Sequence, residues 1–196
     1  MDNRPIGVFD SGIGGLTVVD ALAKSLPNET IYYVGDTARV PYGNKSKSRI
    51  QQYSAEITTW LNKKDCKIII VACNTASALA LKYLSSIFSI PIIGVIESGV
   101  NRGIWMSKNN RIAVLGTSAT IRSNEYEKRI KAAKPGTLVV SQACPLFVPL
   151  AEEGWIEGKI PMQIAAHYLA KIKQEGVDTV ILGCTHYPLL KRTISK

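Results

Sequence analysis

Two short stretches of the chain share one pattern, a β-branched apolar run that stops at a small residue and a cysteine. The first run covers residues 67–71 and leads to Ala72 and Cys73, and the second covers residues 179–182 and leads to Gly183 and Cys184. Continuous apolar runs of this length are typical of strands buried on both faces in a parallel sheet that helices cover. A polar stretch and a helical pattern follow each cysteine, so each thiol is expected at the carboxyl end of a strand, where open α/β sheets place their chemistry. The pattern predicts a pair of thiols that act on one small molecule.

Other roles for these cysteines have to be weighed. A lone buried cysteine is most often a small apolar side chain, but the repetition of the pattern argues against that for Cys73. A zinc site built from Cys73, Cys184 and His186 would lack a C-x₂-C pair, and the other histidine, His167, lies in a helical pattern elsewhere. No metal site is therefore predicted. No stretch at the N-terminus resembles a signal peptide, so we expect reduced thiols and a cytoplasmic location.

Length and charge narrow the classes of protein further. The chain has 196 residues, enough for one large or two small domains, and no apolar run approaches the roughly 20 residues needed to span a bilayer. The net charge is +9, from 24 Lys and Arg against 15 Asp and Glu. These basic residues are scattered and no nucleic-acid-binding motif accompanies them, so the composition indicates a solvated basic surface that favours small anionic substrates. No membrane and no nucleic acid is expected as a partner.

The first half of the chain alternates predicted strands and helices. Strands are predicted at 5–9, 30–34, 67–72 and 90–95, and helices at 16–25, 46–62 and about 74–88. The helix at 16–25 is expected to bury Leu16, Val19, Leu22 and Ala23. The glycine-rich loop before it lacks G-x-G-x-x-G spacing, so its glycines are interpreted as allowing close approach of the backbone to a small ligand.

Two loops of the first half carry candidate site residues. Asp10 ends the first strand and either contacts a ligand or caps the following helix, and the position of the strand end favours the ligand. The loop at 35–44 is long and contains Pro41, Tyr42 and Gly43 in a turn pattern, and ordered loops of that length tend to be functional.

The second half repeats the plan of the first. Strands are predicted at 111–115, 137–140 and 178–182, and helices at about 123–133 and 161–174. A loop at 144–149 is expected to lead to Glu152. The order of elements predicts an α/β protein of two similar domains, residues 1–97 with Cys73 and 98–196 with Cys184, with mainly parallel sheets flanked by helices and an active site in the cleft between them.

Two thiols on opposite walls of a cleft suit the inversion of a carbon centre. One group has to remove a proton from one face while the other supplies a proton to the opposite face, and the roles exchange in the reverse direction. A helix N-terminus favours the thiolate by only about 0.3–1 kcal/mol, so a polar partner is expected beside each thiol. Asp10 and His186 are the candidates, with Glu152 beside the second thiol. No lysine lies beside Cys73 or Cys184 to form a Schiff base, so no cofactor is predicted.

Four motifs together resemble glutamate racemases of the aspartate/glutamate racemase superfamily. These are Phe9 to Leu16, Tyr33 to Gly43, Ala72 to Ser77 and Leu182 to Leu190. The resemblance covers nearly the whole chain. It implies a cofactor-independent, two-base interconversion of L-glutamate and D-glutamate that supplies D-glutamate for bacterial peptidoglycan.

The resemblance also implies roles for individual residues. Cys73 would act on the D-isomer and Cys184 on the L-isomer, with Glu152 as an auxiliary carboxylate and the Thr117 and Thr120 hydroxyls near the α-carboxylate. The residues implied to bind substrate are Asp10, Ser11, Tyr42, Gly43, Asn74, Thr75, Thr117, Thr120, Thr185 and His186.

Two departures and three alternatives accompany the resemblance. Ser98 stands where a proline is common, and a closing segment that returns to the first domain in family members is expected to be absent here, which would expose part of that domain. An aspartate racemase is one alternative, although Thr185-His186 favours glutamate. A truncated non-catalytic homologue and a gyrase-binding role are the others. A homodimer is compatible with the sequence.

Overall fold

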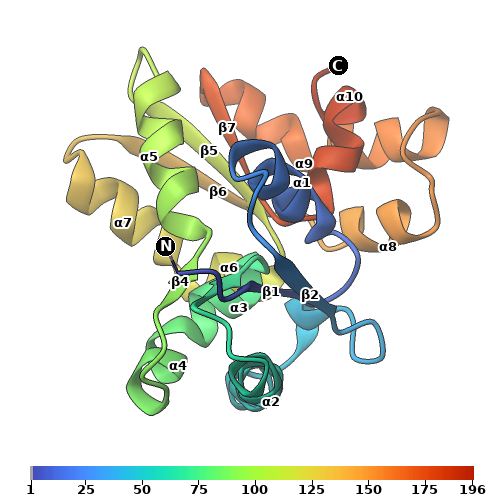
Figure 1. The fold of residues 1–196 in the computed structure, drawn as a ribbon. Helices are drawn as coiled ribbons and strands as arrows, with labels where there is room; N and C mark the ends of the chain where they lie inside the picture. The colour runs from blue at the N-terminus through green and yellow to red at the C-terminus, as the bar shows by residue number, and fades with distance from the viewer. Residues whose placement is uncertain (1) are drawn as a thin grey trace. The chain divides into compact units, whose positions relative to one another are not determined.

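The computed structural model describes residues 2–196, and residue contacts divide the chain into two compact units, Met1–Val95 and Ile96–Lys196. Both units are built from strands and helices that alternate along the chain (Figure 1). Glu97, Ser98 and Gly99, the predicted boundary, lie within the first helix of the second unit.

The first unit holds a four-stranded parallel sheet in the order β2-β1-β3-β4. Its elements are β1 (Ile6–Asp10), α1 (Leu16–Ser25), β2 (Ile31–Gly35), the 3₁₀ turn η1 (Tyr42–Asn44), α2 (Lys47–Lys63), β3 (Ile68–Val71), α3 (Asn74–Leu79), α4 (Leu81–Ile87) and β4 (Ile92–Gly94). Since β2 and β3 flank β1 on opposite sides, the chain changes direction beside β1. In an open α/β sheet this is the place where a crevice forms outside the carboxyl ends of the strands.

Alternate side chains of these strands form the two layers of the first core, because successive residues of a strand point to opposite faces. Ile6 and Val8 pack with Ile70 and Ala72 against the apolar side of α1. Phe9, Ile69 and Val71 belong to the other layer, with residues of α2, α3 and α4. The prediction of strands buried on both faces is confirmed for β1 and β3.

The second unit holds a three-stranded parallel sheet in the order β6-β5-β7. Its elements are α5 (Ile96–Met106), β5 (Arg111–Gly116), α6 (Ser118–Ser123), α7 (Glu125–Ala133), β6 (Leu138–Ala143), α8 (Phe147–Glu152), α9 (Lys159–Gln174), β7 (Thr179–Gly183), η2 (Tyr187–Leu190) and α10 (Lys191–Ile194). Ala113 and Leu115 of β5 pack with α8, α9 and η2, while α5 contacts α7 and β7. The strand order β6-β5-β7 repeats the order β2-β1-β3 of the first sheet.

Several sequence predictions need correction. Leu16 and Ala23 of α1 are exposed, because this helix packs on the sheet through Val18, Val19 and Leu22. The single helix predicted at 74–88 is two helices, α3 and α4, which meet at Ala80.

The second unit departs from the predictions in a further way. Helices α5, α6 and α8 occupy stretches that were predicted as a boundary or as loops. These helices are short or contain Gly, Pro, Ser and Thr, which weakens a helical pattern in the sequence. Strand β7 lies at a sheet edge, and its Val180 is 40% exposed, so β7 is not buried on both faces.

Two hydroxyls on α2 are buried without partners. Ser54 Oγ and Thr58 Oγ1 have no hydrogen-bond partner within residues 2–196, and both residues are fully buried. A buried unpaired hydroxyl destabilises a fold, and an apolar replacement of similar shape removes that cost. We therefore expect Ser54→Ala and Thr58→Val each to raise the free energy of unfolding by about 1 kcal/mol in urea titrations.

Thr59→Val is the matched control for these two changes. Thr59 is exposed on the same helix and its Oγ1 donates to the Ala55 carbonyl at 2.8 Å, so its replacement should not stabilise the protein. A loss of stability in Thr58→Val as large as that in Thr59→Val would contradict the assignment of an unpaired hydroxyl.

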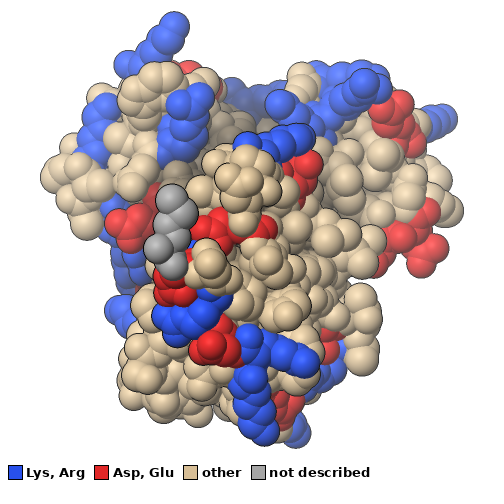
Figure 2. All heavy atoms as spheres, viewed as in Figure 1, with Lys and Arg blue, Asp and Glu red and all other residues tan. Residues whose placement is uncertain are grey.

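The surface charges are mixed on the face of the molecule shown in Figure 2. Lys and Arg alternate there with Asp and Glu rather than forming one basic patch. Pairs such as Lys24 with Asp20 and Lys131 with Glu127, one helical turn apart, contribute to this mixing. No helix within residues 2–196 is long and apolar enough to cross a membrane.

Candidate active site

The first candidate thiol, Cys73, lies at the point where β3 passes into α3. Cys73 is the N-cap of α3, and its Sγ accepts from the Ala76 backbone N–H at 3.5 Å. The thiol also lies 3.7 Å from Ser11 Oγ, which comes from the loop after the neighbouring strand β1. The side chain is buried, with 4% of the residue exposed. The parallel pairing of β1 and β3 thus brings the Ser11 loop to the thiol.

Asp10 is fully buried at the end of β1 and holds the glycine loop in place. Its Oδ2 accepts from the backbone N–H groups of Gly12 and Gly15, each at 3.1 Å. A Cβ on Gly15 would lie 2.4 Å from the Asp10 Cβ, so only glycine permits this close packing. The N-cap of α1 is Gly15 itself, and Asp10 acts on the loop that precedes the helix.

The charge of Asp10 opposes ionisation of the first thiol. Burial, followed by the negative charge of Asp10, raises the pKa of Cys73 to about 12. Hydrogen bonds from the Ala76 N–H, the Ser11 hydroxyl and the Thr75 N–H act in the opposite direction but are smaller. Asp10 was predicted as a partner that favours the thiolate, whereas its charge in the structure favours the neutral thiol.

The loop between β2 and α2 is fixed by a network that the sequence analysis did not identify. The Tyr42 hydroxyl donates to Asp36 Oδ2 at 2.5 Å, and Arg39 Nε donates to the same oxygen at 2.7 Å. Arg39 also pairs with Glu56 on α2 and lies over the ring of Tyr53. Tyr42 is buried, and η1 contacts α3, the helix that Cys73 caps. The signal available in the sequence was the pair of opposite charges, Asp36 and Arg39, within one loop.

The second candidate thiol, Cys184, follows β7 and begins a chain of three side chains. Its Sγ lies 3.8 Å from Nδ1 of His186, and Nε2 of His186 is hydrogen-bonded to Oε1 of Glu152. Glu152 is the last residue of α8. Cys184 and His186 are buried, and the Glu152 side chain is 32% exposed. The structure therefore brings together the second thiol and the two residues predicted to lie beside it, His186 and Glu152.

Aromatic packing positions α8 and η2, the elements on either side of this chain. The Phe147 ring contacts Tyr168 and Tyr187 edge to face, with ring centroids 5.3 Å apart in each pair. The Tyr187 hydroxyl donates to the Cys144 carbonyl at 2.8 Å, which joins the turn after Cys184 to the residues that precede α8. Glu152 and His186 are thus held by the core on both sides.

Two threonines lie at the carboxyl end of the neighbouring strand β5. Thr117 caps α6 by accepting from the Thr120 N–H at 3.2 Å, and the two hydroxyls are 3.0 Å apart. Gly116 and Gly183 are paired in register, so Thr117 and Cys184 each follow directly on the paired ends of β5 and β7. Both threonines are buried, as is Thr185.

The predicted site residues therefore fall into two groups, one in each unit. The first group gathers Asp10, Ser11, Cys73, Asn74 and Thr75 at the ends of β1 and β3, with Tyr42 and Gly43 in the adjoining loop. The second group gathers Thr117, Thr120, Glu152, Cys184, Thr185 and His186. Within residues 2–196, no cluster of three or more His, Cys, Asp or Glu side chains is arranged to hold a metal ion.

Two parallel α/β sheets, each with helices around it and a buried thiol beside polar partners at a strand end, place the chain in the class of two-unit α/β proteins. The comparisons identify the family within this class. The family of Asp/Glu/Hydantoin racemases matches residues 6–196, so the chain belongs to this family and is an amino-acid racemase.

Three relatives illustrate the similarity. A glutamate racemase of Geobacter metallireducens is 52% identical over 193 residues, which are 98% of this chain and 72% of that protein. A glutamate racemase of Aquifex aeolicus is 54% identical over 189 residues, 96% of this chain and 73% of that protein. The crystal structure of glutamate racemase from Francisella tularensis in complex with D-glutamate has a TM-score of 0.93 and 46% identity, and the match covers all of this chain and 73% of that one.

Proposed function

We propose that this chain interconverts L-glutamate and D-glutamate without a cofactor, with Cys73 and Cys184 as the two acid/base groups. The observation that carries the proposal is the equivalence of the two thiols. Cys73 follows β3, which lies beside β1 in the order β2-β1-β3-β4. Cys184 follows β7, which lies in the same way beside β5 in the order β6-β5-β7. Glutamate as the substrate is supported by relatives that are glutamate racemases at about half identity.

In this proposal the two thiols act on opposite faces of the substrate α-carbon. One cysteine, as thiolate, removes the α-proton, and the other, as thiol, delivers a proton to the opposite face. The reaction leaves each cysteine in the protonation state that the other had at the start. Cys73 starts the reaction of the D-isomer and Cys184 that of the L-isomer, and the protons of the two thiols re-equilibrate with solvent between turnovers.

The two thiols reach the thiolate by different routes. Beside Cys73, a substrate ammonium group close to Asp10 offsets the charge that raises the pKa of the thiol, so substrate itself favours ionisation there. Beside Cys184, Glu152 accepts from His186 Nε2–H and leaves Nδ1 to accept the thiol proton. The protonated imidazole then lies between a carboxylate and a thiolate, which stabilises both charges.

Binding groups for the substrate carboxylates are supplied by hydroxyl, amide and backbone donors. The proposal assigns the α-carboxylate to the Thr117 and Thr120 hydroxyls, and the remaining contacts to Ser11, Tyr42, Gly43, Asn74, Thr75, Thr185 and His186. These residues are buried, and buried donors bind an anion more strongly than exposed ones because the local dielectric constant is low. The proposal also includes a cytoplasmic location, a homodimer and D-glutamate as the product used in peptidoglycan.

Circular dichroism of the purified chain with each isomer of glutamate and aspartate tests this function. We expect loss of optical activity from both glutamate isomers and turnover of aspartate at least about 100-fold slower, because a shorter dicarboxylate leaves buried donors unpaired. Activity should survive a chelator and a carbonyl reagent and be lost after thiol alkylation. Faster turnover of aspartate than of glutamate would identify aspartate as the substrate instead. Loss of activity with the chelator alone would contradict a cofactor-independent reaction.

A further inference from the structure

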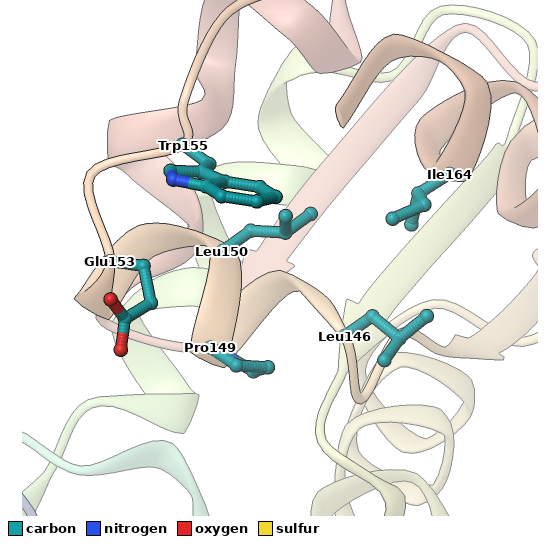
Figure 3. A pocket seen from close by; sticks show the side chains of 6 residues that line it. All are labelled: Leu146, Pro149, Leu150, Glu153, Trp155 and Ile164. Atoms are coloured by element: carbon teal, nitrogen blue, oxygen red, sulfur yellow. The ribbon is translucent and has the colours of Figure 1, made fainter. Parts of the chain in front are cut away.

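A pocket of about 250 Å³ opens beside α8 in the second unit, but its lining selects no ligand. In Figure 3 the Glu153 carboxylate points away from the pocket and from the Trp155 ring. The other lining side chains are apolar, namely Leu146, Pro149, Leu150, Trp155 and Ile164. The first unit holds a feature with more specific chemistry, a set of paired polar side chains in the loop between β2 and α2.

Tyr42 is assigned to the substrate site, yet its hydroxyl is already engaged inside the first core. The hydroxyl donates to Asp36 Oδ2 at 2.5 Å, and the residue is 1% exposed. The Tyr42 ring lies beside that of Tyr53 on α2, with the ring centroids 5.9 Å apart, and packs in the same core cluster as Cys73. A hydroxyl has one proton to donate, and a carboxylate can only accept. The Tyr42 hydroxyl therefore has no proton left for a substrate carboxylate and acts on the loop instead.

Asp36, the acceptor for this hydroxyl, is a buried residue that is tied to the end of β1. Its backbone N–H donates to the Asp10 carbonyl at 3.0 Å, and its side chain is 7% exposed. Arg39 Nε donates at 2.7 Å to the same carboxylate oxygen that accepts from Tyr42. The Arg39 N–H donates to the Asp36 carbonyl at 3.1 Å and closes the turn. One carboxylate thus joins the strand that ends at Asp10 to the loop that contains Tyr42.

Arg39 connects this carboxylate to helix α2. Its guanidinium pairs with Glu56 as well as with Asp36, and it lies 4.2 Å from the centroid of the Tyr53 ring. A buried carboxylate destabilises a fold unless a positive charge pairs with it, and Arg39 supplies that charge. The planar guanidinium can serve two carboxylates and a ring face at once, which a lysine ammonium cannot.

We propose that Asp36 and Arg39 are positioning residues, which hold the Tyr42 hydroxyl in the first core and so fix the Tyr42-Gly43 segment for the substrate. This segment forms the start of η1, and η1 contacts α3, the helix that Cys73 caps. The anchoring of the loop stands on these contacts alone. Its effect on the substrate rests on the proposed function.

Hydrogen exchange measured by mass spectrometry tests the anchoring without reference to activity. We expect Asp36→Ala and Tyr42→Phe each to speed amide exchange in residues 37–45 at least about tenfold and to leave residues 67–72 unchanged. Asp36→Asn keeps an oxygen that can accept from the Tyr42 hydroxyl, so its exchange should stay within about threefold of wild type. Tyr32→Phe is the matched control, because Tyr32 is 40% exposed on β2 and lies outside the network.

Circular dichroism kinetics with D-glutamate test the effect on the substrate. Asp36→Ala and Tyr42→Phe should each raise KM at least about tenfold and keep kcat within about threefold, because the segment binds substrate and moves no proton. The Asp36→Ala/Tyr42→Phe double variant should raise KM no further than the larger single change, since both changes remove the same hydrogen bond. Asp36→Asn and Tyr32→Phe should keep the normal KM. Partial unfolding alone would lower the apparent kcat and leave KM unchanged.

The outcomes separate the anchoring from the function. Unchanged exchange of residues 37–45 in both Asp36→Ala and Tyr42→Phe would overturn the anchoring. Faster exchange with an unchanged KM would overturn the positioning role. A higher KM in Tyr42→Phe but not in Asp36→Ala would overturn it too, because the hydroxyl would then contact the substrate itself. If the wild-type protein racemised neither isomer of glutamate, the proposed function and the effect on KM would fall together, while hydrogen exchange would still decide the anchoring.

Discussion

Replacing either Cys73 or Cys184 with alanine is expected to lower racemisation of glutamate at least about 1,000-fold, because each direction needs one group as base and the other as acid. The polarimetric rate with each isomer measures this loss. Cys66→Ala and Cys144→Ala are the controls. Both of these cysteines are buried in the cores and neither is assigned a role in the reaction, so their variants should keep most of the activity.

The two alanine variants should also differ from each other in a way that a structural role would not produce. In D₂O, the Cys73→Ala protein should exchange the α-hydrogen of L-glutamate without inversion, since Cys184 can remove a proton and return a deuteron on the same face. Cys184→Ala should do the same for D-glutamate. Proton NMR measures both. Exchange with the opposite isomers would reverse the assignment of the thiols, and racemisation by either variant at more than about a tenth of the normal rate would end the two-base proposal.

Asp10→Asn is expected to raise the reactivity of the Cys73 thiol while lowering the rate of racemisation. The Asp10 charge raises the pKa of the thiol, so its removal should lower that pKa and raise the alkylation rate of Cys73 at fixed pH about tenfold. Racemisation should fall at least about 100-fold, because the substrate ammonium loses its counter-charge. Asparagine keeps a side-chain oxygen for the Gly12 and Gly15 N–H groups, so the loop should be retained.

Mass spectrometry of iodoacetamide-treated protein, read at the Cys73 peptide, measures the alkylation. Asp20→Asn is the matched control, since Asp20 lies on the surface of α1 and pairs with Lys24. Asp20→Asn should change neither the alkylation rate of Cys73 nor the rate of racemisation. A parallel fall of alkylation and racemisation in Asp10→Asn would show that Asp10 favours the thiolate, contrary to the direction that the structure indicates.

The strands, the parallel sheets and the two thiols could be predicted from the sequence because their signals are local. The run Ile68–Val71 is apolar at every position, and it ends just before Cys73, which caps the next helix. The repeated order of strands and helices similarly predicted two α/β units. Helices α6 and α8 were missed because six residues with Thr, Ser or Pro carry little periodic signal, and tertiary packing around Phe147 stabilises α8.

Residue type and position near a strand end were enough to predict Cys73, Cys184, Asp10 and His186 as candidates from the sequence. The surroundings of these candidates became visible only in the folded chain. The sign of the effect of Asp10 on Cys73 depends on burial and on the distance between two groups that lie far apart in the chain. The partnership of Glu152 with His186 depends likewise on α8 packing beside η2. Electrostatic energies depend on separation and on local dielectric constant, and the fold sets both.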